Sequence, residues 1–170
     1  FIGDNKILSN AASELEKEGF KIVGIDELLT DIIAPVGILG SVPMNKKLAE
    51  DVRIGIGAAL ELGRLDKGQA VIVKSGKIIM REDRRGTAEL INRVKMLSDS
   101  NNAILIKLKK PGQDTRLDLP TIGIETVKQA SEAKFVGIVI QAGATIIVNR
   151  NSMIKEADKS GLFINSIELD

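Results

Sequence analysis

The chain has 170 residues, of which 44% are hydrophobic and 28% charged, and its formal net charge at neutral pH is +1. This composition is typical of a globular protein with a buried core, and the balanced charge argues against a polyanion-binding role for the whole molecule. The absence of Cys and His excludes disulfides, Ser-His-Asp triads and zinc sites built from those residues. With no Trp or Tyr and four Phe, the chain offers few rings for base stacking, so no nucleic-acid partner is expected.

The remaining functional groups are carboxylates, lysines, hydroxyls and backbone amides. In enzymes such groups usually work with a hard metal ion such as magnesium. No run of about 18 apolar residues is present, so no membrane-spanning helix is expected, and the first residues lack the basic and apolar regions of a signal peptide. The chain begins at Phe1 without an initiator Met, and we expect it to be a fragment of a longer protein.

Residues 1–34 are predicted to be the remnant of an N-terminal α/β domain. Asp4 or Ser9 caps an amphipathic helix that runs to about Glu18. The apolar run FKIVGI (20–25) predicts a buried strand, and the DELL that follows it (26–29) predicts a short helical turn. These elements are too few for a domain, which is consistent with a remnant.

A linker and then a larger C-terminal domain are predicted to follow. Residues 35–45 contain two Pro and two Gly, which indicates a linker or an extended crossover. The C-terminal domain occupies residues 46–170 and opens with a long helix, capped by Asn45 and ended by Gly63.

Strands and helices alternate in the rest of this domain. Ser75-Gly76 between two apolar runs predicts a hairpin over 69–83. Further strands are predicted at 102–107, 134–141, 144–149 and 162–167, with a short strand or extended edge at 115–119. Helices are predicted at 87–97, 124–133 and 152–161.

These elements predict an α/β fold, a mixed β-sheet with helices packed on it. The hairpins expected at 69–83 and 135–149 place antiparallel pairs in the sheet, which distinguishes it from a Rossmann fold. Neither a G-x-G-x-x-G loop after a strand nor a Walker A loop is present in the sequence.

The loop REDRRGTAE (81–89) is a candidate anion or metal site, because it follows a strand and opens a helix. Gly86 and Thr87 lie at the predicted helix start, where unpaired N–H groups favour an anion. Glu82 and Asp83 are potential metal ligands. The alternative is an ordinary capped helix with a solvated run of charges.

The stretch from Lys107 to Gly123 is the second candidate. Alternation in TRLDL would place Arg116 and Asp118 on one face, with Lys107 and Lys110 approaching from the end of a strand. Arg and Lys suit phosphate, and Asp suits magnesium or proton transfer. The alternative is a surface Arg–Asp pair on a stiff loop.

The small residues of QAGAT (141–145) form a third candidate, where a ligand or backbone would approach closely. We favour the alternative, a tight hairpin turn.

Several segments together resemble one known family. They are GRLDKGQAVIVKSGKII, EDRRGTAELINRV, IKLKKPGQDTRLDLPTIGIETV, VGIVIQAGATIIV and IKEADKSGLF, which occur in this order. The chain is similar over essentially its whole length to the UDP-2,3-diacylglucosamine pyrophosphatase family of lipid A biosynthesis, in its two-domain form rather than the calcineurin-like form.

The resemblance implies hydrolysis of the pyrophosphate bond of UDP-2,3-diacylglucosamine to UMP and 2,3-diacylglucosamine 1-phosphate. It implies a divalent cation, usually Mg2+, and a cytoplasmic protein with peripheral contact to the inner membrane. The implied partner is the lipid-linked nucleotide sugar, and a homodimer is expected.

The resemblance also implies roles for individual residues. Glu82 and Asp118 are the expected catalytic and metal-binding carboxylates. The expected substrate-binding residues are Gly86, Thr87, Lys107, Lys110, Gln113 and Arg116, with the three cationic side chains clamping the diphosphate.

One position departs from the family pattern. The family carries an Asp directly after its Gly-Thr, taken to be essential for turnover, and this chain has Ala88 there. Either another nearby carboxylate, such as Glu82, Asp83 or Glu89, replaces it, or the chain is a catalytically impaired binder of the same substrate or product. A purely structural domain is the third alternative. Gln141 also stands where many relatives have Glu.

Overall fold

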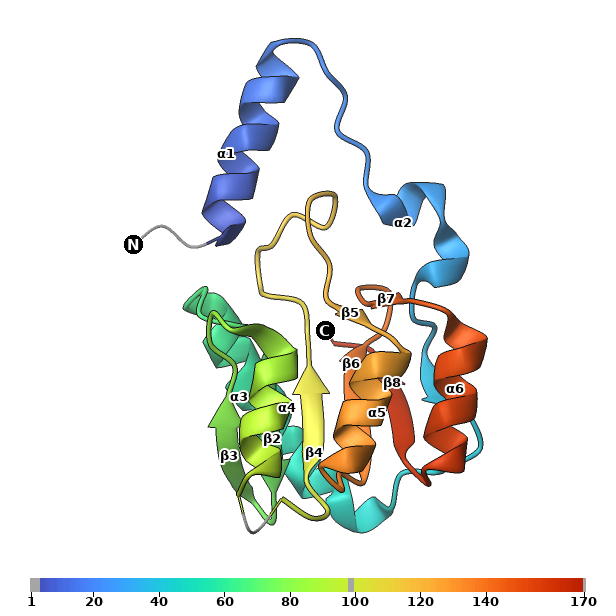
Figure 1. The fold of residues 1–170 in the computed structure, drawn as a ribbon. Coiled ribbons are helices and arrows are strands. Elements are labelled where there is room, and N and C mark those ends of the chain that lie inside the picture. The colour runs from blue at the N-terminus through green and yellow to red at the C-terminus, as the bar shows by residue number, and fades with distance from the viewer. Residues whose placement is uncertain (1–3, 98–99, 170) are drawn as a thin grey trace.

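A six-stranded mixed sheet forms the centre of the molecule (Figure 1). The structure, a computed structural model, describes residues 4–97 and 100–169. The strand order is β1-β8-β6-β4-β2-β3. The strands are β1 (Gly37–Leu39), β2 (Ala70–Lys74), β3 (Lys77–Arg81), β4 (Ile104–Lys107), β6 (Gly137–Gln141) and β8 (Phe163–Ile167). Strands β4, β6 and β8 are parallel, and β1 and β2 pair antiparallel to their neighbours.

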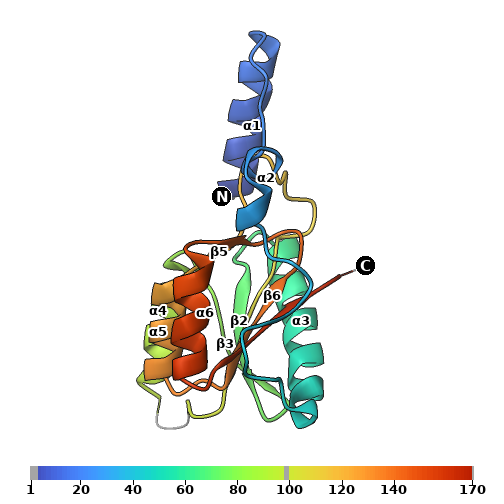
Figure 2. The same cartoon turned by 90° about the vertical axis from the view of Figure 1, so that its right-hand side faces the viewer.

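Helices cover both faces of this sheet (Figure 2). Helix α3 (Ala49–Arg64) lies on one face, and α4 (Gly86–Lys95), α5 (Ile124–Glu132) and α6 (Arg150–Lys159) lie on the other. The central strands are apolar runs because both of their faces are buried. The α/β class with a mixed sheet and packed helices is confirmed.

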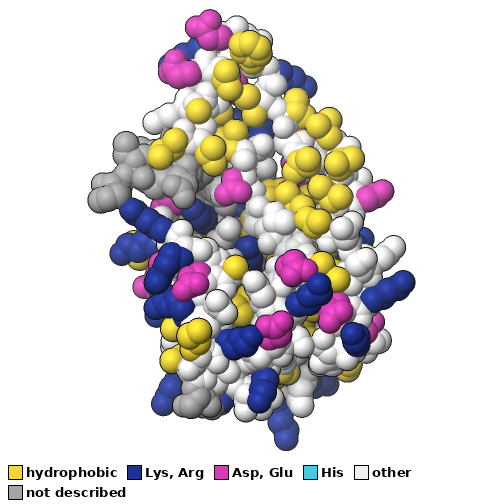
Figure 3. All heavy atoms as spheres, in the orientation of Figure 1, with side chains coloured by type: hydrophobic (Ala, Val, Ile, Leu, Met, Phe, Trp, Pro, Cys, Tyr) yellow, Lys and Arg dark blue, Asp and Glu magenta, His cyan; other side chains and the backbone are white. Residues whose placement is uncertain are grey.

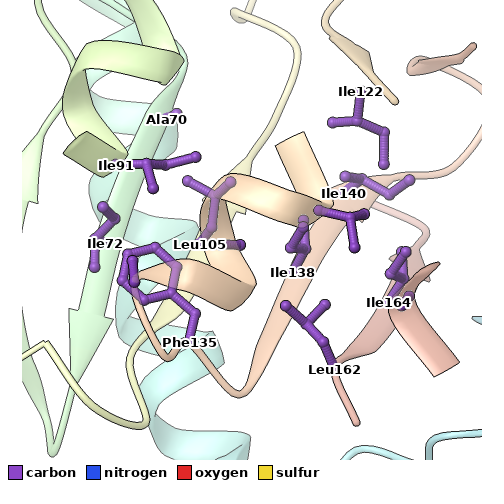
Figure 4. Close-up of a cluster of buried hydrophobic side chains, with 14 of the residues drawn as sticks. Ala70, Ile72, Ile91, Leu105, Ile122, Phe135, Ile138, Ile140, Leu162 and Ile164 are labelled. Atoms are coloured by element: carbon purple, nitrogen blue, oxygen red, sulfur yellow. The ribbon is translucent and has the colours of Figure 1, made fainter. Parts of the chain in front are cut away.

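Two hydrophobic cores result from this layering. One lies between the sheet and α4, α5 and α6, and Figure 4 shows its isoleucine-rich centre, with Ile72, Leu105 and Ile138 from neighbouring strands. The other lies under α3 and includes Val73, Ile106 and Phe163. Together they fix the ends of the strands, and hence the loops that follow them.

The hairpin predicted over 69–83 is confirmed. Ser75 and Gly76 form its turn with φ values of 50° and 76°, the left-handed region that such two-residue turns need. The buried carboxylate of Asp51, in α3, accepts the backbone N–H groups of both turn residues. The hairpin is thus tied to the helix above it.

The N-terminal segment differs from its prediction. Helix α1 (Asp4–Lys17) is present and projects away from the sheet, followed by α2 (Ile25–Leu28) and the 3-10 turn Thr30–Ile32 (Figure 1). Residues 20–24 are extended but belong to no strand, and Phe20 is 63% exposed. The predicted strand at 20–25 is wrong, because no neighbouring strand of the described residues pairs with this apolar run.

The stretch predicted as a linker or crossover contributes to the sheet. Residues Gly37–Leu39 form the edge strand β1, antiparallel to β8. Asn45 then caps the 3-10 turn Lys46–Leu48, which leads into α3.

Two further predictions are wrong: the hairpin over 135–149 and the strand or extended edge at 115–119. The chain leaves β6 through Ala142 and Gly143, whose backbone N–H groups bond to Ile167 and Ala34 instead of to a returning strand. The next strand, β7 (Ile146–Ile147), pairs in parallel with β5 (Thr121–Ile122) in a separate small sheet, so residues 135–149 are not a hairpin. Residues 115–117 form a turn, and residues 118–119 belong to no strand.

No helix within the described residues has the length and apolar character needed to cross a membrane.

Candidate functional site

Several predicted site residues lie at one edge of the sheet. Glu82 directly follows β3, Lys107 ends β4 and Gln141 ends β6. These three strands run in the same direction, because β3 and β4 are both antiparallel to β2 and β6 is parallel to β4. Ligand sites of open α/β sheets gather at this edge, beyond the carboxyl ends of the strands.

Glu82 is a buried carboxylate held by two donors. It is 6% exposed. Its Oε2 accepts the backbone N–H of Gln69 at 2.6 Å and its Oε1 accepts the Thr87 hydroxyl at 2.5 Å. The predicted neighbours Glu82 and Thr87 are therefore brought into direct contact, with Thr87 in the first turn of α4.

Lys107 is a buried cation and not a surface clamp. It is 8% exposed, and its Nζ donates to the backbone carbonyl of Thr121 at 3.0 Å. Burial lowers the pKa of Lys107 below the usual lysine value, and the negative charges of Glu82 and Asp118 oppose that shift. The ammonium therefore lies within electrostatic reach of both predicted catalytic carboxylates.

Gln113 connects the loop after β4 to Asp118. It is 4% exposed, its Nε2 donates to Asp118 Oδ2 at 2.7 Å, and its Oε1 accepts the backbone N–H of Lys110 at 3.3 Å. Gln141 adds a second support, because its Oε1 accepts the Lys109 backbone N–H at 3.1 Å. Glu82, Lys107, Gln113 and Asp118 are called the inner cluster below.

The strand alternation that was predicted to place Arg116 and Asp118 on one face is absent, although both residues line one hollow. Because residues 115–117 form a turn, the guanidinium reaches Asp114 at 2.7 Å and Glu16 of α1 at 2.7 Å. Hydrogen bonds to Asp114 and then Glu16 raise the pKa of Arg116, and hydrogen bonds from Arg116 lower the pKa of Asp114. Glu16, Asp114 and Arg116 are called the outer cluster.

The arginine loop before α4 is partly self-neutralised. Asp83 accepts hydrogen bonds from Arg85 at 2.6 Å and Arg93 at 3.0 Å. The Arg85 hydrogen bonds, above all, lower the pKa of Asp83. Asp83, considered as a metal ligand or as a substitute for the missing Asp, is therefore already paired with two guanidinium groups. Ala88 lies exposed in the first turn of α4.

Lys110 has a partner that the sequence did not reveal. Its Nζ donates to Asp66 Oδ1 at 2.7 Å, and the two side chains are only 12% and 29% exposed. Asp66 follows the end of α3 and is 44 residues away in sequence. The one available signal was its place inside the GRLDKG motif.

Two hollows open next to these clusters. The larger has a volume of about 530 Å3 and is lined by Leu62, Asp66, Lys67, Glu82, Asp83, Arg84 and Arg85. The smaller, of about 320 Å3, lies between α2 and the loop before β5 and is lined by Val23, Ile25, Leu28, Thr115, Arg116, Leu117, Asp118, Leu119, Thr121 and Ile146. Exposed hydrophobic side chains gather over α1 and α2, above the layered domain (Figure 3).

Glu82 and Asp118 are the carboxylates of the inner cluster that could hold a metal ion. Within residues 4–97 and 100–169, no three acidic side chains cluster as a metal cage would require. Glu82 and Asp118 both oppose the lowering of the Lys107 pKa, so each lies within electrostatic range of that ammonium. One or two carboxylates plus substrate phosphates are a common ligand set for magnesium.

Comparison with known proteins identifies relatives of this chain. Residues 35–165 match the family described as the LpxI C-terminal domain. The chain is 36% identical over 173 aligned residues to the UDP-2,3-diacylglucosamine pyrophosphatase LpxI of Caulobacter vibrioides, an alignment that covers 98% of this chain and 62% of that relative. The chain thus spans less than two thirds of the relative's length, and the inner cluster falls inside the matched region.

Proposed function

Because this chain belongs to the family of LpxI C-terminal domains, we propose that it hydrolyses the pyrophosphate bond of UDP-2,3-diacylglucosamine to UMP and 2,3-diacylglucosamine 1-phosphate. The observation that carries the proposal is the inner cluster. A buried ammonium within reach of two carboxylates, at the carboxyl edge of the sheet, is an arrangement that a structural core does not need. It suits a reaction in which negative charge on phosphate oxygens must be offset.

Each side chain of the site has a separate task in this proposal. Lys110, paired with Asp66 of the larger hollow, neutralises the diphosphate. Thr87 offers its backbone N–H at the start of α4, where the Gly86 N–H already donates to the Asp83 carbonyl at 2.9 Å. Lys107 contributes a buried positive charge whose pKa responds to Glu82 and Asp118. Gln113, which had been expected to touch substrate, holds Asp118 and the Lys110 backbone in place.

A divalent cation, most simply Mg2+, would be held by Glu82 and Asp118. When bound, it would withdraw charge from phosphate oxygens. The carboxylates also have the chemistry to orient a water molecule toward phosphorus.

The smaller hollow suits an acyl chain of the substrate. Apolar side chains from α2 and from the loop before β5 line it, and Asp118 and Arg116 lie in the same wall. Lipid and reacting phosphate would then meet at Asp118. We place the reaction in the cytoplasm with peripheral contact to the inner membrane, and we propose a homodimer. The exposed hydrophobic residues Phe20, Leu28 and Leu29 support such contacts.

Ala88 favours a second candidate, a binder of the same substrate or product with impaired turnover. A methyl group neither binds a metal nor transfers a proton, and the side chain lies exposed where the resembling family has Asp. Asp83 is not a ready replacement, since two arginines already bind it.

The deciding experiment is phosphorus NMR of the chain with UDP-2,3-diacylglucosamine and Mg2+. Appearance of UMP supports the hydrolase. Binding detected by calorimetry without release of UMP supports the binder. If neither binding nor UMP release is detected, a structural role remains. Ala88→Asp sharpens the result. An acidic side chain in the first turn of a helix stabilises the helix by about 0.3–1 kcal/mol. We expect turnover to rise at least tenfold, which corresponds to an activation free energy lower by roughly 1.4 kcal/mol. If the parent chain is inactive and Ala88→Asp is inactive too, the missing carboxylate is not the cause of the inactivity.

A further inference from the structure

Asp66 occupies a backbone position that normally belongs to glycine. At the end of α3, the N–H of Lys67 bonds to the carbonyl of Leu62 and the N–H of Asp66 bonds to the carbonyl of Gly63. These two bonds define a Schellman-type helix end, whose left-handed residue is most often Gly. Asp66 holds that position with φ of 50°. Asp tolerates this conformation better than most residues but gains nothing locally over Gly.

The gain lies instead in the contact with Lys110. The 2.7 Å pair joins the end of α3 to the loop after β4, and both side chains are largely shielded from water. The end of α3 and the loop after β4 also approach each other closely at the backbone, because a Cβ added at Gly63 would lie 2.8 Å from Pro111 Cδ and 3.1 Å from Lys110 Cα. Asp66 and Lys110 therefore meet across a tightly packed junction and not through two flexible surface arms.

This junction lies beside the inner cluster. Asp66 and Glu82 line the same hollow of about 530 Å3. The Lys110 ammonium is consequently held by a carboxylate that lines that hollow, and the bond to Asp66 uses one of its three N–H donors. A lysine of this kind meets an incoming phosphate without first losing the conformational freedom of its long side chain.

We propose that Asp66 is a positioning residue of the phosphate site, which fixes the Lys110 ammonium at the hollow shared with Glu82. This inference rests on the proposed hydrolase function for its effect on turnover. Its structural part concerns Lys110 and an anion, and stands without turnover.

Two variants separate positioning from folding. Asp66→Gly removes the carboxylate and puts the favoured residue at the helix end, and Asp66→Asn keeps the shape and removes the charge. We expect neither to lower the melting temperature, while both reduce kcat for UMP release at least about tenfold. Glu125→Gln, which breaks the exposed Glu125–Lys128 pair on α5, is the matched control and leaves kcat unchanged.

Two readouts need no turnover. Calorimetry with inorganic pyrophosphate measures anion affinity, which we expect both variants to reduce. Acetic anhydride labelling followed by peptide mass spectrometry measures the reactivity of each lysine amine, and Lys110 should become more reactive in both variants while the other lysines do not.

The outcomes are distinguishable from a failure of the proposed function. A parent chain without UMP release contradicts the hydrolase, but pyrophosphate affinity and Lys110 labelling still test Asp66. Unchanged labelling and affinity in both variants would overturn the positioning role. Tighter pyrophosphate binding would show that Asp66 competes with the anion, and loss of stability in Asp66→Gly would show a structural residue; either result contradicts the proposal.

Discussion

The inner and outer clusters both include residues of the loop between β4 and β5 but have opposite characters. The inner cluster is interlocked, with Glu82, Lys107 and Gln113 all less than 9% exposed. In the outer cluster Arg116 is bound by two carboxylates, and the side chains of Glu16 and Arg116 are 41% and 37% exposed. Charges buried beside each other at the edge of a sheet indicate function, whereas a solvated guanidinium between two carboxylates is ordinary surface chemistry. Four variants and conditions test this difference.

The largest expected effect is that of Lys107→Met. Turnover should fall at least about 100-fold, because the cation that offsets charge in the site is lost. The free energy of unfolding at neutral pH should not fall, since burial lowers the Lys107 pKa and the folded protein therefore disfavours its charged form. UMP release and urea unfolding measure the two quantities.

The control for this variant is Lys128→Met, which removes an exposed lysine of similar size. It should alter neither quantity appreciably. A Lys107→Met protein that turns over normally, or that unfolds at much lower urea, would show that Lys107 is a structural residue.

The second effect is a dependence on alkaline pH. Folding lowers the Lys107 pKa, so between that value and the unfolded value of 10.5 the unfolded state binds more protons. Stability therefore rises with pH across this interval and is lost as pH falls through the folded pKa, while activity declines in the same interval as the ammonium loses its proton.

Urea titrations and kcat measured at steps up to pH 10.5 detect both trends. The stability trend should be weaker in Lys107→Met than in the parent chain. Parallel pH curves for the two proteins would assign the alkaline change to other lysines.

Gln113→Ala should have a smaller effect, which acts through position. It deprives Asp118 and the Lys110 N–H of a partner, and because both groups are only partly buried, the loss of stability should lie at the lower end of about 1–3 kcal/mol. Turnover should fall together with stability. Gln113→Glu keeps one acceptor but adds a negative charge that faces Asp118, so it should lower both quantities further. Wild-type stability in Gln113→Ala would mean that the loop does not depend on this bridge.

The sequence predicted much of the fold because most of its signals are local. The 69–83 hairpin follows from Ser75-Gly76 between two apolar runs, and the helices follow from their periodicity. The two wrong predictions, the strand at 20–25 and the hairpin at 135–149, both depend on which strands pair with each other. An apolar run such as FKIVGI favours burial, but distant parts of the chain decide whether another strand lies beside it.

The site was predictable in its residue types and less so in its geometry. The motif residues Glu82 and Thr87 do touch. Nothing local shows that Lys107 and Gln113 are buried, or that Arg116 pairs with Glu16 and Asp114. A turn at 115–117 replaces the expected alternation. Asp66 escaped notice since its partner lies 44 residues away.

Arg116→Gln should show the smallest effect and complete the comparison. The guanidinium is already satisfied by Asp114 and Glu16, so its loss should leave kcat and the melting temperature within about twofold and a few degrees of the parent values. Because Arg116 lines the smaller hollow, KM should rise by up to about tenfold at low ionic strength, and the difference should shrink as salt is added. Arg53→Gln, which breaks a more exposed pair with Glu50 on α3, is the control and should leave KM unchanged. A fall in kcat as large as that of Lys107→Met would place Arg116 among the reacting groups and remove the distinction between the two clusters.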